Sequence, residues 1–245
     1  MNNSIERVKQ AIEAVVAESS VPEDPVHSKN TLEWLLRLKP DADEALQIAA
    51  IGHDIERAIE CRKVRRADFD HYDEFKAAHA RNSALVLREI MQKCGLPTAI
   101  SDDVCRLVCR HEVGGDQRSD LLKDADAISY FDVNLPFYFE REGYAETLRR
   151  TLWGYRRLSA GMRHLARTIT YETDSLNTLL REAVLAANVE FLVAWWLPCA
   201  TPVIAASFGG VTYQASFAAG EIRWLATGSG CAPLAGLEDG YPSNP

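Results

Sequence analysis

The dipeptide His53-Asp54 joins two side chains that bind metal ions, and it directly follows the apolar run Ile48–Gly52. Burying an imidazole and a carboxylate in such a setting is costly unless something pairs them. A divalent metal ion does so, because neutral imidazole and ionised carboxylate are both ligands and the ion compensates the buried charge. The dipeptide therefore predicts a buried metal site.

Four further side chains of these two kinds lie in the same part of the chain. His27, His79 and His111 lie in or at the ends of segments with helical periodicity, and Asp126 lies in the apolar segment Leu121–Ser129. A helical bundle brings together residues that are far apart in sequence, so these side chains are candidate ligands. The predicted metal ligands are His27, His53, Asp54, His79, His111 and Asp126.

Each of these residues also has a purely structural interpretation. His53-Asp54 would then be a buried hydrogen-bonded pair. Asp126 would be a solvent-facing carboxylate, with Asp124 as the competing ligand two residues away. The remaining histidines would be ordinary helix-start, polar or core residues.

Helical periodicity dominates the chain up to about residue 190 and predicts an all-α domain over residues 1–190. Breaker signals such as Lys39-Pro40 and Gly95 separate the helical segments. The expected helices span residues 4–18, 26–39, 43–60, 73–94, 101–111, 119–131, 144–159, 162–171 and 175–192. The third of them places His53-Asp54 inside a helix.

Residues 191–245 form a segment of different composition, with no charged residue from Phe191 through Gly220. The run from 191 to 209 has the length of a membrane span, but Pro198, Pro202 and the absence of a basic flank argue against one. A short β-hairpin over residues 211–217 and 221–226, or an irregular tail, is favoured. An altered reading frame would also produce such an abrupt change.

Composition excludes several classes of protein. The 245-residue chain has a formal net charge of -8, which disfavours binding to a nucleic-acid polymer because phosphate backbones require a basic surface. The first ten residues are polar and charged, unlike a secretory signal, so a cytoplasmic protein is expected. The six cysteines form no CxxC pair and are expected to be reduced.

The ordered set of six predicted ligands resembles the HD superfamily of metal-dependent phosphohydrolases, whose pattern is H, HD and D, with two extra histidines in its two-metal members. The segment Lys123–Ser129 resembles that family's closing motif, and Val26-His27-Ser28 before a leucine-rich helix resembles its opening. The resemblance covers roughly residues 20–135 and implies an HD-domain helical bundle.

The same resemblance implies which ligands bind which metal ion. The H, HD and D positions would bind one ion, and Asp54 would bridge to a second ion held by His79 and His111. The implied cofactors are one or two divalent ions (Mn, Mg, Fe, Co or Ni). The ions would activate water for attack on the phosphorus of a nucleotide or another small phosphorylated metabolite.

Positive side chains near the predicted ligands are candidates for holding substrate phosphate, because a guanidinium fork matches phosphate oxygens. Arg57 follows His53 by about one helical turn, and Arg110 directly precedes His111. Lys123 is a candidate for the rim of the pocket.

Glu56 is a candidate general acid or base, and Asp54 and Arg57 complete the predicted catalytic residues. The branch of the HD superfamily that hydrolyses (p)ppGpp carries HDxxED. This chain departs from that motif at His53–Arg57, which argues against an alarmone substrate.

Two other functions share the predicted ligands. HD-fold proteins that resemble myo-inositol oxygenase hold a mixed-valent pair of irons with the same residue pattern and activate dioxygen. A ligand-sensing module without catalytic activity is the second alternative. The sequence leaves open the substrate, the metal, and whether the chain forms a homo-oligomer.

Overall fold

The computed structural model describes residues 2–196, 204–208, 211–218 and 221–227. Every regular element of residues 2–196 is a helix, which confirms the predicted all-α class for this part of the chain. Contacts divide the chain into two compact units, Met1–Asn188 and Val189–Pro245. The sequence-based boundary after residue 190 lies within two residues of that division.

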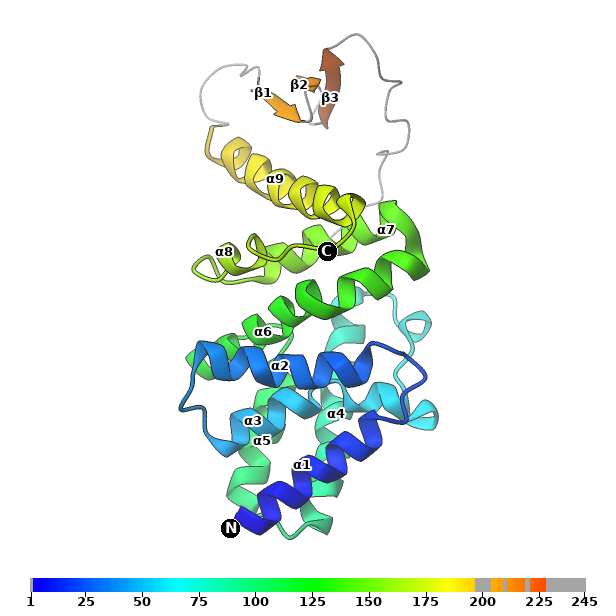
Figure 1. Ribbon diagram of the computed structural model, residues 1–245, viewed down its shortest axis with the longest axis vertical. Helices are drawn as coiled ribbons and strands as arrows, with labels where there is room; N and C mark the ends of the chain where they lie inside the picture. The colour runs from blue at the N-terminus through cyan, green and yellow to red at the C-terminus, as the bar shows by residue number, and fades with distance from the viewer. Residues whose placement is uncertain (1, 197–203, 209–210, 219–220, 228–245) are drawn as a thin grey trace. The chain divides into compact units, whose positions relative to one another are not determined.

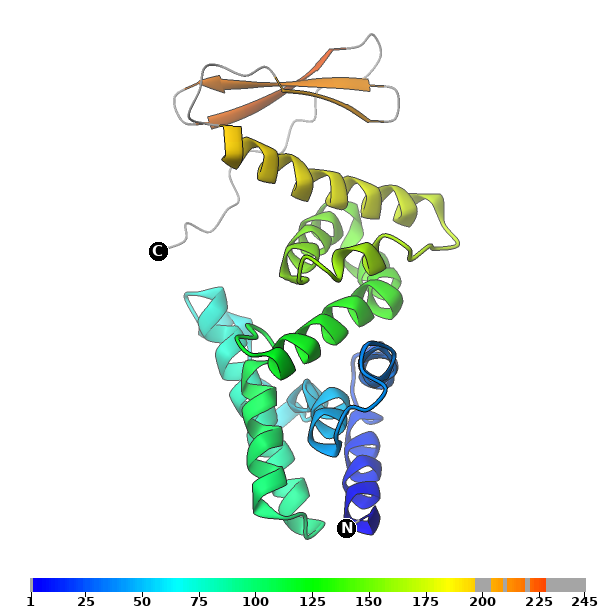
Figure 2. The same ribbon diagram turned by 90° about the vertical axis from the view of Figure 1, so that its left-hand side faces the viewer.

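The first half of the helical unit consists of six helices of unequal length (Figure 1). They are α1 (Asn2–Val16), α2 (Asp24–Leu38), α3 (Glu44–Gly52), α4 (Tyr72–Lys93), α5 (Thr98–Arg110) and α6 (Gln117–Ser129). The consecutive helices α4 and α5 run side by side as a hairpin (Figure 2). Helix α3 lies among α1, α2, α5 and α6 and is the central helix of this unit.

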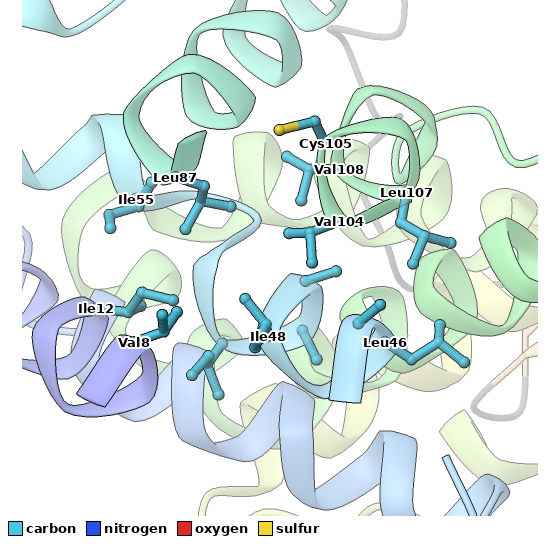
Figure 3. Close-up of a cluster of buried hydrophobic side chains, with 14 of the residues drawn as sticks. Val8, Ile12, Leu46, Ile48, Ile55, Leu87, Val104, Cys105, Leu107 and Val108 are labelled. Carbon is cyan, nitrogen blue, oxygen red and sulfur yellow. The ribbon is translucent and has the colours of Figure 1, made fainter. Parts of the chain in front are cut away.

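The central position of α3 follows from its composition. From Ala45 to Gly52 every residue except Gln47 is buried, as an almost purely apolar segment requires. Around it, Val8 and Ile12 of α1 face Ile48 of α3, and side chains of α4 and α5 close the other side (Figure 3). This core fixes the end of α3, where His53 follows.

Gly52 allows α3 and α4 to approach closely. A Cβ atom added to Gly52 would lie 2.5 Å from Cδ2 of Leu87 in α4. Because real Cβ contacts are not this short, any larger residue would push the two helices apart or displace Leu87.

Helix α3 ends eight residues earlier than the predicted helix over residues 43–60, so this boundary prediction is wrong. His53, the residue that follows α3, keeps helical dihedral angles, whereas Asp54 leaves them (φ −106°, ψ 12°). Three short 3-10 helices follow, η1 (Ile55–Ala58), η2 (Glu60–Arg62) and η3 (Arg66–Asp68). The helix ends here because the side chains of His53 and Asp54 turn toward partners on other helices.

A second core supports the rest of the helical unit. Helix α6 passes through a π-helical turn, η4 (Tyr130–Asn134), into α7 (Leu135–Arg157), which is interrupted at Gly143 (φ 76°, ψ −178°). The short α8 (Arg163–Ala166) and α9 (Asp174–Trp196) follow. Phe131, Tyr155 and Leu179 are fully buried in this core, which anchors the C-terminal end of α7.

The C-terminal unit contains a three-stranded antiparallel sheet in the order β1 (Ile204–Phe208), β2 (Val211–Ala218), β3 (Glu221–Thr227). The pairing of β2 with β3 confirms the predicted hairpin, whereas β1 was not predicted from the sequence. None of the described helices has the length and apolar character needed to cross a membrane. Residues 197–203 and 209 of the segment considered as a membrane span lie outside the described residues.

Candidate metal centre

The structure brings all six predicted ligands together at the middle of the helical unit. The predicted set therefore comes from five helices and the turn after α3. His27 lies on α2, His53 ends α3, Asp54 begins the following turn, His79 lies on α4, His111 ends α5, and Asp126 lies on α6.

His27, His53 and Asp126 form the first of two groups that could hold a metal ion, which we call group one. Oδ1 of Asp126 lies 3.1 Å from Nε2 of His27 and 3.4 Å from Nε2 of His53. The two imidazole Nε2 atoms are 3.2 Å apart. All three residues are at least nine-tenths buried, so water does not compensate their charge.

Asp54, His79, His111 and Glu112 form the adjoining group, which we call group two. Oδ1 of Asp54 lies 2.7 Å from Nε2 of His79 and 3.7 Å from Nε2 of His111. The same oxygen lies 3.8 Å from Nε2 of His53 in group one. Asp54 therefore lies where the two groups meet, as a bridging carboxylate would.

Each of the four histidines directs its Nε2 atom into the centre, because its Nδ1–H group donates a hydrogen bond to an acceptor outside the centre. His53 donates to the carbonyl of Ala50 (2.9 Å), and His111 donates to the carbonyl of Val108 (2.7 Å). His79 Nδ1 lies 2.6 Å from the carboxylate of Glu56. Such outer partners fix the tautomer and the orientation of a metal-binding imidazole.

His27 is oriented by Ser129, whose hydroxyl lies 2.9 Å from Nδ1 of His27. The hydroxyl of Ser129 donates its own proton to the carbonyl oxygen of His27, so it accepts from the ring. The Nε2 atoms of His27 and His53 consequently face each other as acceptors when both rings are neutral. Two lone pairs at this separation need a cation or a proton between them.

His111 provides a further sign of a binding site. Its ring is fully buried, and among the described residues its Nε2 atom has no hydrogen-bond partner. A buried polar atom without a partner costs free energy and requires an explanation. A metal ion bound by Nε2 would supply that partner.

The outer oxygens of the two aspartates contact arginine side chains. Oδ2 of Asp54 accepts a hydrogen bond from Arg57 (2.9 Å), and Oδ2 of Asp126 accepts one from Arg157 (3.0 Å). Each carboxylate thus keeps Oδ1 for the centre while a guanidinium fixes its orientation. Both arginines are charged at all relevant pH values.

The electrostatic balance favours cations at both groups. Burial lowers the pKa of His53, but the carboxylates of Asp54 and Asp126 outweigh it and raise the pKa to about 9. Burial also lowers the pKa of His79, but the carboxylates of Asp54 and Glu56 outweigh it, so the pKa of His79 is raised. Without an ion each group therefore stabilises a proton, and a divalent cation is stabilised for the same reason.

Glu56 does not face the centre, which corrects its predicted role as general acid or base. Its Oε1 accepts from His79, and its Oε2 accepts from the backbone N–H of Val64 (2.7 Å) and from Asn82 (3.2 Å). Glu56 is buried behind His79 because the chain turns after α3 instead of continuing as a helix. It orients His79.

Two predicted phosphate-binding side chains are engaged elsewhere, and these predictions are corrected. Arg110 is exposed and lies near Asp116 (3.5 Å), whereas Lys123 pairs with Asp120 (3.1 Å). Their positions on the helices direct them toward the loop between α5 and α6. Arg57, by contrast, lies at the centre, bonded to Asp54 and to Asp24 (3.0 Å), and is partly exposed.

The two neighbouring aspartates of α6 have different partners. Asp124 is buried but accepts the backbone N–H of Ser159 (2.8 Å), away from the histidines. Asp126 contacts the histidines of group one, as expected from the sequence. The two side chains diverge because residues two apart lie on different faces of a helix.

Sequence reasoning missed Glu112, Arg157 and Lys76. Oε1 of Glu112 lies 3.2 Å from Nε2 of His111 and contacts Lys76, and Oε2 lies 3.1 Å from Arg157. The adjacency of Glu112 to His111 is a signal that the sequence did contain. Arg157 gave none, because it reaches Asp126 only through the packing of α7.

Comparison with known proteins gives a single family. A family model described as "Domain of unknown function (DUF4202)" matches residues 6–179, which include every residue of both groups. No curated protein and no solved structure gives a significant match to the chain.

Proposed function

The chain belongs to the DUF4202 family, and we propose that it catalyses the metal-dependent hydrolysis of a phosphate ester. One observation carries the proposal: two adjoining groups of imidazole and carboxylate donors meet at Oδ1 of Asp54. Two metal ions held side by side are typical of enzymes that displace groups at phosphorus. The H, HD, H, H, D order of the ligands, which resembles the HD superfamily, supports the same assignment.

The donor set fits divalent ions of intermediate hardness. Imidazole nitrogen suits Zn, Fe, Co and Ni, and carboxylate oxygen suits Mn and Mg. When bound, such an ion polarises a phosphoryl oxygen and lowers the pKa of a water molecule that it holds. The residues of the chain position the donors: Ser129, Glu56 and two backbone carbonyls orient the imidazoles, and Arg57 and Arg157 orient the carboxylates.

Arg57 is the residue we propose to contact the substrate. Its guanidinium is already held by Asp54 and Asp24, and 29% of its side chain is exposed beside the centre. A guanidinium fixed in this way presents its remaining N–H groups to a phosphate oxygen with little loss of conformational freedom. The substrate class is a nucleotide or another small phosphorylated metabolite, because a chain of this negative charge disfavours nucleic-acid polymers.

A second candidate function is dioxygen activation by a pair of irons. The observation that favours it is the pair of adjoining groups of imidazole and carboxylate donors, since these ligand types suit iron as well as Mn or Co. The two functions differ in the metal that supports turnover and in the need for dioxygen.

Metal analysis of the purified protein, followed by assays on phosphomonoesters and phosphodiesters with Mn, Mg, Co, Ni and Fe, tests the proposal. We expect one or two ions per chain and hydrolysis that a chelator abolishes and added metal restores. Turnover of an organic substrate only with iron and dioxygen would replace hydrolysis by the second function. Bound metal with no turnover of any kind would favour a sensing module.

A further inference from the structure

Glu112 brings a third carboxylate to the centre, in addition to Asp54 and Asp126. It directly follows His111 at the end of α5 and is largely buried, with 7% of its side chain exposed. Burial of a carboxylate at this depth requires cations around it. Among the described residues, the cationic side chains of Lys76 and Arg157 contact it.

The two oxygens of Glu112 have different surroundings. Oε2 lies 3.1 Å from Arg157, as in an ordinary buried ion pair. Oε1 lies 3.2 Å from Nε2 of His111, the buried nitrogen that has no hydrogen-bond partner among the described residues. Oε1 and Nε2 would form an ion pair if the imidazole were protonated, and a metal ion bound by both atoms would take the place of that proton.

The donor atoms of group two, one carboxylate oxygen of Glu112 among them, all lie within 4.8 Å of one another. Such separations suit atoms that share one ion, because ligand atoms about 2.1 Å from a metal are at most about 4.2 Å apart, and a small adjustment of the side chains closes the difference. We propose that Glu112 is a ligand of the second metal ion, completing a site with Asp54, His79 and His111. This inference rests on the proposed function, which supplies the two-ion centre.

The position of Lys76 leads to a testable difference between two substitutions. Its ammonium group contacts Oε1, the oxygen that would bind the ion, whereas Arg157 contacts Oε2. Lys76 therefore competes with the ion for the same oxygen, and 16% of its side chain is exposed, which gives it a route to solvent. Removal of Glu112 should weaken the second site, and removal of Lys76 should not.

The metal-free full-length protein is titrated with Mn²⁺ by isothermal calorimetry, and the bound ions are counted by elemental mass spectrometry. Mn²⁺ is the better probe because the exposed thiols of Cys61 and Cys109 bind zinc. The variants are Glu112→Gln, which keeps the shape of the side chain, and Lys76→Gln as the matched control. The double variant Lys76→Gln/Glu112→Gln also removes Lys76, whose carboxylate partner Glu112→Gln takes away, so it serves if the single variant is unstable.

We expect two ions in the parent protein and a loss of at least about tenfold in affinity for one of them in Glu112→Gln and in the double variant, since even outer partners of ligands are worth that much. Lys76→Gln should bind both ions at least as tightly as the parent. Two ions at parental affinity in the folded Glu112→Gln protein would overturn the assignment. So would an equal loss in Lys76→Gln, because the ion-pair network alone would then explain both effects.

The same measurements separate this proposal from the proposed function. Loss of one ion in Glu112→Gln, together with no phosphate-ester hydrolysis by the parent, would defeat the function and leave the ligand assignment standing. A parent protein that binds a single ion and hydrolyses phosphate esters would defeat only the assignment. A parent protein that binds no ion would defeat both.

Discussion

The two ligand groups differ in how they depend on the rest of the chain. Group one comprises His27, His53 and Asp126, whose elements α2, α3 and α6 contact one another directly. Group two comprises Asp54 and residues of the α4–α5 hairpin. The side chains of Lys76 and of Arg157 in α7 form ion pairs with its Glu112. The centre therefore joins two halves that different helices support, and these halves meet at the end of α3.

Substitution of the residue shared by both halves should have the largest effect. In Asp54→Ala, Oδ1 is lost to both groups, so we expect metal binding to collapse and hydrolysis to fall by about a thousandfold or more, because the ions supply several kcal/mol of transition-state stabilisation. Steady-state kinetics and metal content measure the change. Asp102→Ala, at an exposed carboxylate that pairs with Arg88, is the control. Full activity of Asp54→Ala would end the mechanistic proposal.

Removal of a ligand from only one group should separate the halves. His79→Ala is expected to bind one ion where the parent binds two, because group one keeps all its donors. His53→Ala is expected to lose metal and activity together, since its Nε2 lies within 4 Å of both aspartates. The number of metal ions bound per chain, measured for both variants, shows whether the two groups bind separate ions. Equal loss in both would mean that the groups form a single site.

The hydrogen-bond partners of the histidines, Ser129 for His27 and Glu56 for His79, allow the two groups to be weakened one at a time. Ser129→Ala should weaken the ion of group one and Glu56→Gln the ion of group two, each by about tenfold to a hundredfold. In a His79→Ala background only the first ion remains, so Ser129→Ala should weaken it further while Glu56→Gln should have no effect. Calorimetric titration of the double variants with Mn²⁺ measures both. A loss from Glu56→Gln in that background would contradict the separation.

Gly52 tests the packing that brings the halves together. Gly52→Ala should lower the free energy of unfolding by about 1–3 kcal/mol, because the added methyl group overlaps Leu87 of α4. Gly161→Ala is the matched control, since nothing lies within 4 Å of its added Cβ atom. Denaturant unfolding of metal-free protein provides the measurement. Equal stability of the two variants would show that α3 and α4 can separate at no cost.

Asp116 should give the smallest effect. It caps α6, the helix that carries Asp126, and the backbone N–H and hydroxyl of Ser119 hold its pKa below the usual value of 3.8. A carboxyl with a depressed folded-state pKa stabilises the protein above the unfolded value and loses that contribution as the pH falls through the folded value. The stability difference between the parent and Asp116→Ala should therefore be full at neutral pH and shrink below about pH 4. A difference that is constant down to pH 2 would contradict the cap.

The helical class and the six candidate ligands could be predicted from the amino-acid sequence alone. Helical periodicity is local, and imidazole and carboxylate groups beside apolar runs such as Ile48–Gly52 have few stable solutions other than a shared cation. These features depend on residue type and spacing alone, so one chain suffices to read them.

The three-dimensional structure was needed to show where α3 ends, that Glu56 lies behind His79, and that Glu112 and Arg157 reach the centre. These outcomes depend on contacts between distant segments, such as the one between His27 and Ser129, which are 102 residues apart. The apolar pattern before Gly52 predicts a longer helix, but Asp54 leaves helical dihedral angles and pairs with His79 of α4 and with Arg57 of η1.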